Sequence, residues 1–364
     1  MNLRQRLIVV GCMALGLGVY AHAQSTPPPV NVDRDPVAAP EGDAPIAPPA
    51  ITGAQGTVSR TGSGQFVLRR DAAEVVLNAT VVDANQHLVE NLDKSAFHVY
   101  EDGVPQTIVG FRHEDIPISL GILIDSSGSM YNKVEPVRTA AMDLIRASNK
   151  QDETFIVNFS DEAFIDQDLT SDTEKLSSAL NRFRPAGGTA IYDAVVESAD
   201  YLAQFAKKPK QVLLVITDGD DHDSTSSLES AIRRVQDMDG PVVYCIGLLF
   251  GSEDMDRASR KHSQRVLQDL ADQTGGIAFF PRSVDDVDAI TRQVAQDIRS
   301  QYTISYHSTR PYTEQGYRQI HVDAKAKGYP KLIVRTRSGY FPKKPGSATP
   351  APENAPNLKG QTGK

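Results

Sequence analysis

The chain has 364 residues, of which 38 are basic and 46 acidic, so its formal net charge is −8. This length suggests roughly two or three domains of ordinary size. The acidic balance, without any stretch of clustered lysine and arginine, argues against a sequence-independent nucleic-acid binder, which would carry a basic stripe.

The first residues have the features of an export signal. Two arginines precede an apolar segment, residues 7–20, and Ala21-His22-Ala23 follows as a small-x-small cleavage pattern. We therefore expect residues 1–23 to be a signal peptide and the protein to be exported to the periplasm or secreted, with association with the cell envelope as an option. The apolar segment is shorter than the about 20 residues that span a bilayer. We expect no stable membrane span after cleavage, and an uncleaved anchor is the alternative.

Proline is concentrated at both ends of the chain. Eight of the 22 prolines lie between Pro27 and Pro49, and five lie between Pro342 and Pro356. Such composition cannot bury enough apolar surface to offset the entropy of ordering the backbone. We therefore expect a Pro-rich linker at residues 24–65 and a disordered tail at residues 343–364.

Short apolar runs alternate with amphipathic helical stretches from residue 117 to residue 300. The helical stretches carry apolar residues three or four positions apart, as in Val134, Val137 and Ala141. This alternation predicts an α/β fold with a doubly wound, mostly parallel sheet that is covered by helices on both faces. The expected strands are residues 120–124, 155–159, 212–216, 242–249 and 277–280.

Strand patterns precede and follow this α/β region. They occupy residues 66–116 and 301–342, and each segment alone is too small to bury a comfortable core, because a small sheet needs a second layer. We expect the two segments to pack together as one small β-sandwich. The α/β domain, residues 117–300, is then inserted between the two halves of this sandwich.

Oxygen-bearing side chains follow two of the expected strands. Asp125-Ser126-Ser127-Gly128-Ser129 comes directly after the first strand, Thr217-Asp218-Gly219 follows the third, and Gly187-Gly188-Thr189 opens a helix between them. Ligands of doubly wound sheets bind at the carboxyl ends of strands, near the switch in strand order. We therefore expect five residues to converge there: Asp125, Ser127, Ser129, Thr189 and Asp218. Ordinary turn formation is the alternative, since Ser, Asp and Gly favour such loops.

This donor set suits a hard divalent cation. Such cations prefer oxygen ligands, so Mg²⁺ is the first choice, with Mn²⁺ and Ca²⁺ as alternatives. Neutral hydroxyl ligands leave most of the charge of the ion uncompensated, and an open coordination position then attracts a carboxylate. We expect the partner to be a protein that presents an Asp or Glu side chain.

In this order on an α/β frame, the five residues resemble the metal-ion-dependent adhesion site of a von Willebrand factor type A domain. The resemblance covers about residues 118–300. The flanks, such as residues 97–103 and 339–341, resemble the exported von Willebrand A-related group first described from Acidobacteria. The resemblance implies that Ser127, Ser129 and Thr189 are hydroxyl ligands, whereas Asp125 and Asp218 act largely through bound water.

The sequence therefore indicates a metal-dependent adhesion or scaffold protein and not an enzyme. It has no Gly-x-Ser-x-Gly elbow, no phosphate-binding Gly-x-x-x-x-Gly-Lys loop and no His-Glu-x-x-His motif. A metal-independent scaffold in the cell envelope is the alternative, followed by a metal-dependent hydrolase. The run Asp218 to Asp223 has an aspartate where a calcium loop requires glycine, so we expect it to be a solvated acidic loop.

Overall fold

The computed structural model describes residues 74–237, 240–250 and 256–343, together with the backbone of three short strands. These are β1 (Gly56–Arg60), β2 (Phe66–Arg70) and β17 (Lys359–Gly360). β1 pairs with β2, and β17 pairs with β9 (Ala163–Thr170), so β1 and β17 add short strands in segments expected to be irregular. The predicted signal peptide lies outside the described residues. Among the residues that the structure describes, no helix is long and apolar enough to cross a membrane.

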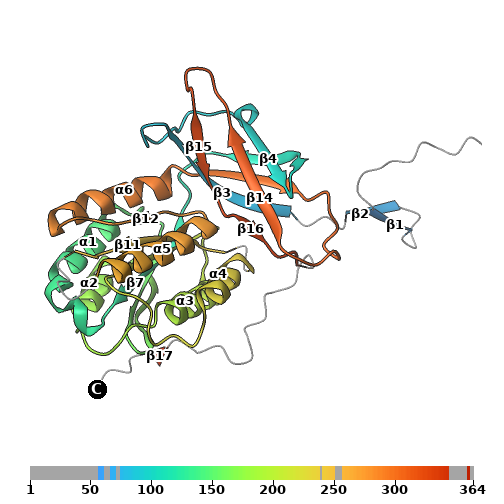
Figure 1. The fold of residues 1–364 in the computed structure, drawn as a ribbon. Helices are drawn as coiled ribbons and strands as arrows, with labels where there is room; N and C mark the ends of the chain where they lie inside the picture. Colours follow the sequence, from blue (N-terminus) through green and yellow to red (C-terminus); the bar gives the residue numbers. More distant parts are fainter. Residues whose placement is uncertain are drawn as a thin grey trace, which may run out of the picture. The chain divides into compact units, whose positions relative to one another are not determined.

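A seven-stranded sheet forms the centre of the α/β domain, in the order β12-β11-β10-β7-β8-β9-β17 (Figure 1). Neighbouring strands from β12 to β8 are parallel, and β9 is antiparallel to β8. β7 is buried on both faces, which explains its unbroken apolar run. The strand bounds are β7 (Ile118–Asp125), β8 (Glu153–Phe159), β10 (Lys210–Thr217), β11 (Val242–Gly247) and β12 (Ala278–Phe279). The mostly parallel sheet predicted from the sequence is confirmed.

Helices cover both faces of this sheet. Apolar residues of α1 (Val134–Ala147), α2 (Thr173–Leu180) and α6 (Val287–Arg299) belong to one buried cluster. Those of α3 (Ile191–Phe205), α4 (Leu228–Asp237) and α5 (Arg257–Thr274) belong to a second cluster. Leu120 and Ile122 of β7 join the first cluster and Leu123 joins the second, because successive strand side chains point to opposite faces.

The segments on either side of the α/β domain form one β module. Its two four-stranded sheets have the orders β15-β3-β13-β6 and β16-β14-β4-β5. Each sheet contains strands from both ends of the chain, and the two sheets share one apolar core, so the α/β domain is inserted between the two segments as predicted. The strands are β3 (Glu74–Asp83), β4 (Phe97–Glu101), β5 (Val104–Gln106), β6 (Ile108–Arg112), β13 (Tyr302–His307), β14 (Arg318–Ala324), β15 (Leu332–Arg335) and β16 (Gly339–Tyr340).

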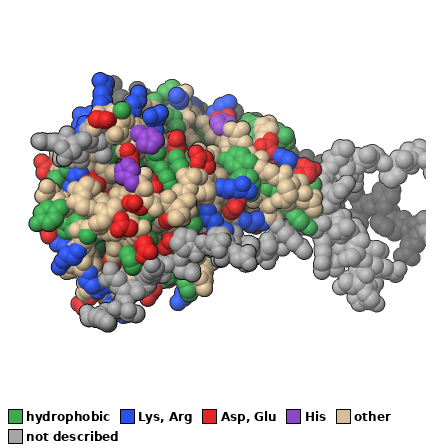
Figure 2. All heavy atoms as spheres, turned by 60° about the horizontal axis from the view of Figure 1, so that its bottom comes forward, with side chains coloured by type: hydrophobic (Ala, Val, Ile, Leu, Met, Phe, Trp, Pro, Cys, Tyr) green, Lys and Arg blue, Asp and Glu red, His purple; other side chains and the backbone are tan. Residues whose placement is uncertain are grey.

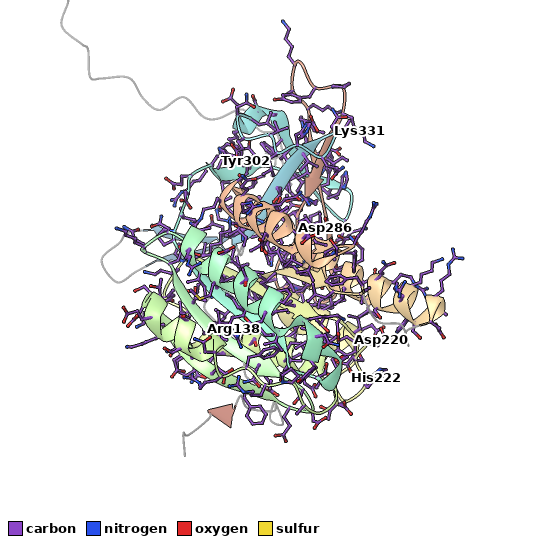
Figure 3. All side chains as sticks on the ribbon, turned by 90° about the vertical axis from the view of Figure 1, so that its left-hand side faces the viewer. Arg138, Asp220, His222, Asp286, Tyr302 and Lys331 are labelled. Atoms are coloured by element: carbon purple, nitrogen blue, oxygen red, sulfur yellow. The ribbon has the colours of Figure 1, made fainter. Side chains whose placement is uncertain are left out.

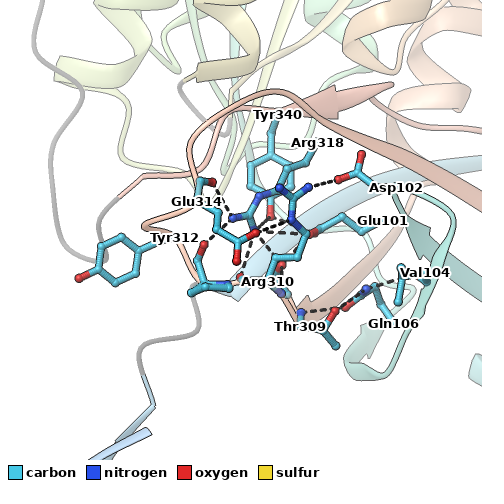
Figure 4. Close-up of polar contacts among 12 residues, drawn as sticks. Glu101, Asp102, Val104, Gln106, Thr309, Arg310, Tyr312, Glu314, Arg318 and Tyr340 are labelled. Atoms are coloured by element: carbon cyan, nitrogen blue, oxygen red, sulfur yellow. Dashed lines mark hydrogen bonds and ion pairs between the residues drawn. The ribbon is translucent and has the colours of Figure 1, made fainter. Parts of the chain in front are cut away.

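A buried ion pair stands in the core of the β module (Figure 4). The guanidinium group of Arg318 is 1% exposed, and its Nη1 lies 3.4 Å from the fully buried carboxylate of Glu101. Nη1 also donates to Ser308 Oγ at 2.8 Å, while Tyr306 and Tyr340 donate their hydroxyls to Glu101 at 2.8 and 3.0 Å. Buried charges are tolerated when they are paired and hydrogen-bonded in this way.

Polar contacts join the end of α6 to the β module. Asp297 accepts hydrogen bonds from Arg335 Nη2 of β15 at 2.8 Å and from Thr80 Oγ1 of β3 at 3.4 Å. It also accepts one from the Tyr244 hydroxyl of β11 at 2.8 Å. The buried carboxylate of Asp297 therefore contacts two neighbouring strands of the β module, β3 and β15, and also β11 of the central sheet.

The burial of Lys210 is expected to make the stability of the protein depend on pH. This buried residue starts β10 and donates to the carbonyl of Ile298 at the end of α6. Burial, aided by the positive charge of Arg299, lowers its pKa to about 7, although nearby aspartates oppose the shift. At pH values between about 7 and 10.5, the Lys210 amine is protonated in the unfolded chain but neutral in the folded chain. The free energy of unfolding therefore rises with pH over this range.

We expect the free energy of unfolding to increase by about 2 kcal/mol between pH 7 and pH 9 in the unsubstituted chain. Lys210→Met should abolish most of this increase, whereas Lys207→Met, at an exposed position, should keep it. Urea unfolding followed by circular dichroism measures both. An unchanged pH slope in Lys210→Met would show that the lysine is not the titrating group.

Candidate functional site

The two site carboxylates follow neighbouring strands. Asp125 is the last residue of β7 and Asp218 comes directly after β10, which pairs with β7 in parallel. The chain leaves β7 toward β8 on one side, while β10 lies on the other, so this edge is the topological switch point of the sheet. Both aspartates are buried, at 0% and 1% exposure.

Hydrogen bonds link four of the five predicted residues. Asp125 accepts from the backbone N–H of Ser127 at 2.8 Å. The hydroxyl oxygens of Ser127 and Ser129 are 3.0 Å apart, and Ser129 donates to Asp218 Oδ1 at 2.7 Å. The Asp-x-Ser-x-Ser turn therefore aims its side chains across the sheet edge toward the second carboxylate.

The loop that carries Thr189 closes onto the same place. Gly128 N–H donates to the carbonyl of Gly187 at 3.2 Å, and the Thr189 hydroxyl lies 3.9 Å from the point where a Cβ on Gly219 would be. The structure thus brings all five predicted residues to one edge of the sheet.

Two aspartates outside the predicted set hold the Thr189 loop. Asp161 accepts from Gly188 N–H at 2.5 Å, and Asp223 accepts from Thr189 N–H at 2.8 Å. A Cβ on Gly188 would lie 1.8 Å from Asp223 Oδ2, so this close approach of backbone and carboxylates requires glycine.

The acidic loop after β10 does more than face solvent, which corrects our expectation. Besides Asp223, Asp221 accepts from the backbone N–H of Tyr192 at 3.0 Å and Asp220 accepts from the hydroxyl of Ser263. Carboxylates are favourable at the start of a helix, where unpaired N–H groups point outward, and Tyr192 is in the first turn of α3. Asp220 and His222 lie close together in this loop (Figure 3).

Burial changes the pKa of the Asp125 carboxyl group. Loss of solvent raises the pKa of Asp125 to about 6, against the effect of hydrogen bonds from Ser127 and Thr217, and the charge of Asp218 raises it further. Thr217 donates its hydroxyl to Asp125 Oδ2 at 2.5 Å. A nearby cation would favour the ionised form of this group.

Lys133 and Thr217 also belong to this cluster and were not predicted from the sequence. Lys133 is 6% exposed and its Nζ lies 2.6 Å from Asp218 Oδ2. One signal could have drawn attention to it, because a lysine directly before α1 stands at the positive end of the helix dipole, where cations are disfavoured. Thr217 carried no signal beyond its place next to Asp218.

The donor set fits a hard divalent cation. Adjacent ligands of an octahedral Mg²⁺ site, each about 2.1 Å from the ion, lie about 3.0 Å apart. The Ser127 and Ser129 oxygens have this separation, and Ser129 is exposed, so the site has an open side. Within residues 74–237, 240–250 and 256–343 there is no cluster of three His, Cys, Asp or Glu side chains placed to hold a metal ion. Metal binding here would therefore depend on the hydroxyl groups.

The surface offers no basic stripe on the face shown in Figure 2, where acidic and basic side chains are interspersed. This agrees with the acidic balance of the sequence.

Comparisons with known proteins identify the α/β domain. Residues 120–293 match the family model of the von Willebrand factor type A domain. No curated protein matches the chain.

Several solved structures are similar to parts of the chain. An aerotolerance-related membrane protein from Bacteroides fragilis is 22% identical over 50% of this chain and 98% of its own, with a TM-score of 0.40. A von Willebrand factor type A protein from Catenulispora acidiphila is 14% identical over 74% of both chains, with a TM-score of 0.44. The von Willebrand factor domain of the type V pilus tip protein Mfa5 from Porphyromonas gingivalis is 12% identical over 50% and 95%, with a TM-score of 0.41. The family match and the observed sheet together identify residues 120–293 as a von Willebrand factor type A domain.

Proposed function

We propose that this is an exported protein-binding protein whose von Willebrand factor type A domain holds a divalent cation, Mg²⁺ first, and uses it to bind a carboxylate of a partner protein. One observation carries the proposal: the hydroxyl oxygens of Ser127 and Ser129 are 3.0 Å apart at an exposed sheet edge, beside the carboxylates of Asp125 and Asp218. This is the separation of neighbouring ligands around Mg²⁺, about 3.0 Å.

Each residue would have a distinct role in this site. Ser127, Ser129 and Thr189 would supply neutral hydroxyl ligands, and the two buried aspartates would supply negative charge behind them. The cation would provide an electrophilic position for an incoming Asp or Glu carboxylate. Thr217, by donating to Asp125, and Asp223, by holding the Thr189 backbone, keep these groups in place.

The contacts of Ser127 support binding over catalysis. Its hydroxyl faces Ser129, whereas a serine nucleophile needs a hydrogen-bonded base that is itself oriented by a third group. The geometry of Ser127 therefore does not support a role as the nucleophile of a hydrolase.

The Lys133 ion pair favours one alternative, a metal-independent scaffold. Its ammonium group already places a positive charge against Asp218, 2.6 Å from Oδ2. A domain stabilised in this way could bind a partner through its surface without any metal ion. Chelation separates the two functions, because only the metal-dependent one is lost.

Selection of phage-displayed peptides on the immobilised full chain tests the proposal. In Mg²⁺ we expect enriched peptides to share an Asp or Glu, to be released by EDTA, and to lose binding when that residue is replaced by Asn or Gln. Peptides that bind equally well in EDTA would support the metal-independent scaffold. Peptides that keep binding after the acidic residue is replaced would contradict the carboxylate mechanism.

A further inference from the structure

A buried lysine lies against the candidate metal site. Lys133 ends the short 3-10 helix η2 (Gly128–Lys133), four residues after Ser129. Its side chain is 8% exposed, and its Nζ lies 2.6 Å from Oδ2 of Asp218, whose side chain is fully buried. The ring centroid of Phe250 lies 5.8 Å from the same ammonium group, within the range of a cation–π contact.

This position is costly for a cation. Burying a charged group is unfavourable unless it is paired, and the adjoining N-terminus of α1 adds positive potential. The contact with Asp218 offsets this cost. The two oxygens of the Asp218 carboxylate therefore have different partners. Oδ2 accepts a hydrogen bond from Lys133 Nζ, and Oδ1 accepts one from the hydroxyl of Ser129.

We propose that Lys133 is an internal counter-charge that weakens the hold of the site on its divalent cation and strengthens the attraction of the loaded site for a carboxylate. The inference rests on the proposed function. The three side chains Asp125, Asp218 and Lys133, counted by themselves, carry two negative charges and one positive charge, a net charge of −1. With a divalent cation the sum becomes +1, whereas without the lysine it would be 0.

Charges this close in a buried site interact strongly enough to measure. Removal of the lysine charge should tighten metal binding by about tenfold or more, because two charges a few ångströms apart in a partly desolvated site are coupled by at least the energy of one tenfold step. The affinity of the loaded site for an anion should fall by a similar factor.

Calorimetric titration of the full chain with Mn²⁺ tests the first part. We expect Lys133→Met to bind Mn²⁺ at least about tenfold more tightly than the unsubstituted chain. The matched control, Lys175→Met, removes an exposed lysine that pairs with Asp172, and it should leave the affinity unchanged. Equal Mn²⁺ affinities in Lys133→Met and the unsubstituted chain would overturn the inference and leave the proposed function standing.

Acetate tests the second part. Its binding to the Mn²⁺-loaded protein can be followed by the water-proton relaxation rate, which falls as the anion displaces bound water. Weaker acetate binding in Lys133→Met supports the inference, and equal or tighter binding contradicts it.

The remaining outcomes separate the two proposals. Mn²⁺ binding by Lys133→Met alone would support the counter-charge and contradict metal binding by the natural chain, whereas no binding by either would contradict both. If Lys133→Met and Lys133→Gln fold only when Mn²⁺ is present, the metal has replaced the lysine charge beside Asp218, as the inference requires. Failure of both variants to fold even in Mn²⁺ would overturn it.

Discussion

Replacement of Arg318 by methionine is expected to lower the free energy of unfolding by about 3–5 kcal/mol, because it leaves a buried carboxylate without its counter-charge. That carboxylate is Glu101, which is fully buried and lies 3.4 Å from the guanidinium group. The side chain also donates to the carbonyls of Arg310 and Pro311, at 3.1 and 2.7 Å, and both of these hydrogen bonds would be lost (Figure 4). Urea unfolding followed by circular dichroism measures the loss.

Arg310 provides the matched control. Its side chain is 36% exposed and pairs with Asp102 and Glu314 at the surface. Exposed ion pairs contribute about 0–1 kcal/mol, so Arg310→Met should change stability little. If Arg318→Met cost no more than Arg310→Met, the buried pair would not be a main support of the β module. The double variant Arg318→Met/Glu101→Leu should recover part of the loss, because it removes both charges together.

Loss of the two serine hydroxyls is expected to weaken Mn²⁺ binding by more than about a hundredfold, given that even indirect partners of a metal typically contribute about ten- to a hundredfold. The variant is Ser127→Ala/Ser129→Ala, which removes both of the hydroxyl oxygens that lie 3.0 Å apart. Asp218 keeps its contact with Lys133 in this variant, so we expect the fold to persist. Electron paramagnetic resonance of free Mn²⁺ gives the affinity.

Ser126 serves as the control in the same turn. Its hydroxyl donates to the carbonyl of Phe159 at 3.0 Å and takes no part in the contacts between Ser127 and Ser129. Ser126→Ala should bind Mn²⁺ as the unsubstituted chain does. Equal loss in Ser126→Ala and the double variant would indicate a general disturbance of the loop and not the removal of ligands.

The central sheet could be predicted because its strands are buried on both faces. β7 and β10 therefore read as unbroken apolar runs, and the polar residues that end them must lie at one edge of a parallel sheet. β9 was not predicted. Its sequence, AFIDQDLT, has two buried positions and six partly or fully exposed ones, because it pairs in antiparallel fashion near the end of the sheet.

Charged residues in buried positions were the hardest to predict. Arg318 shares one face of β14 with Ile320 and Val322, so strand alternation alone places it toward the core. The partner, Glu101, is 217 positions away, and the pairing depends on β14 lying next to β4. Lys133 and Asp218 are likewise 85 positions apart, and their contact depends on the path of η2. The sequence pattern indicates which face of a strand carries a charged side chain, but its ion-pair partner is decided by the topology of the fold.

The five candidate site residues could be proposed from the sequence because most of their spatial relations are local in the chain or follow from one strand pairing. Asp125, Ser127 and Ser129 are close in the chain, and the spacing within one turn sets their relation. Asp218 follows the strand paired with β7. The position of Thr189 was harder to predict, because its loop is held by hydrogen bonds to Asp161 and Asp223. The sequence carries no local signal for these two roles.

The most direct measurement is a titration of the full chain with Mn²⁺, followed by the electron paramagnetic resonance signal of the free ion. We expect the chain to remove one Mn²⁺ per molecule from solution, excess Mg²⁺ to release it, and Ser127→Ala/Ser129→Ala to bind Mn²⁺ more than about a hundredfold more weakly. A free-ion signal that is unaffected by the unsubstituted chain, or Mn²⁺ binding of unchanged affinity in the double variant, would contradict a cation held at Ser127 and Ser129.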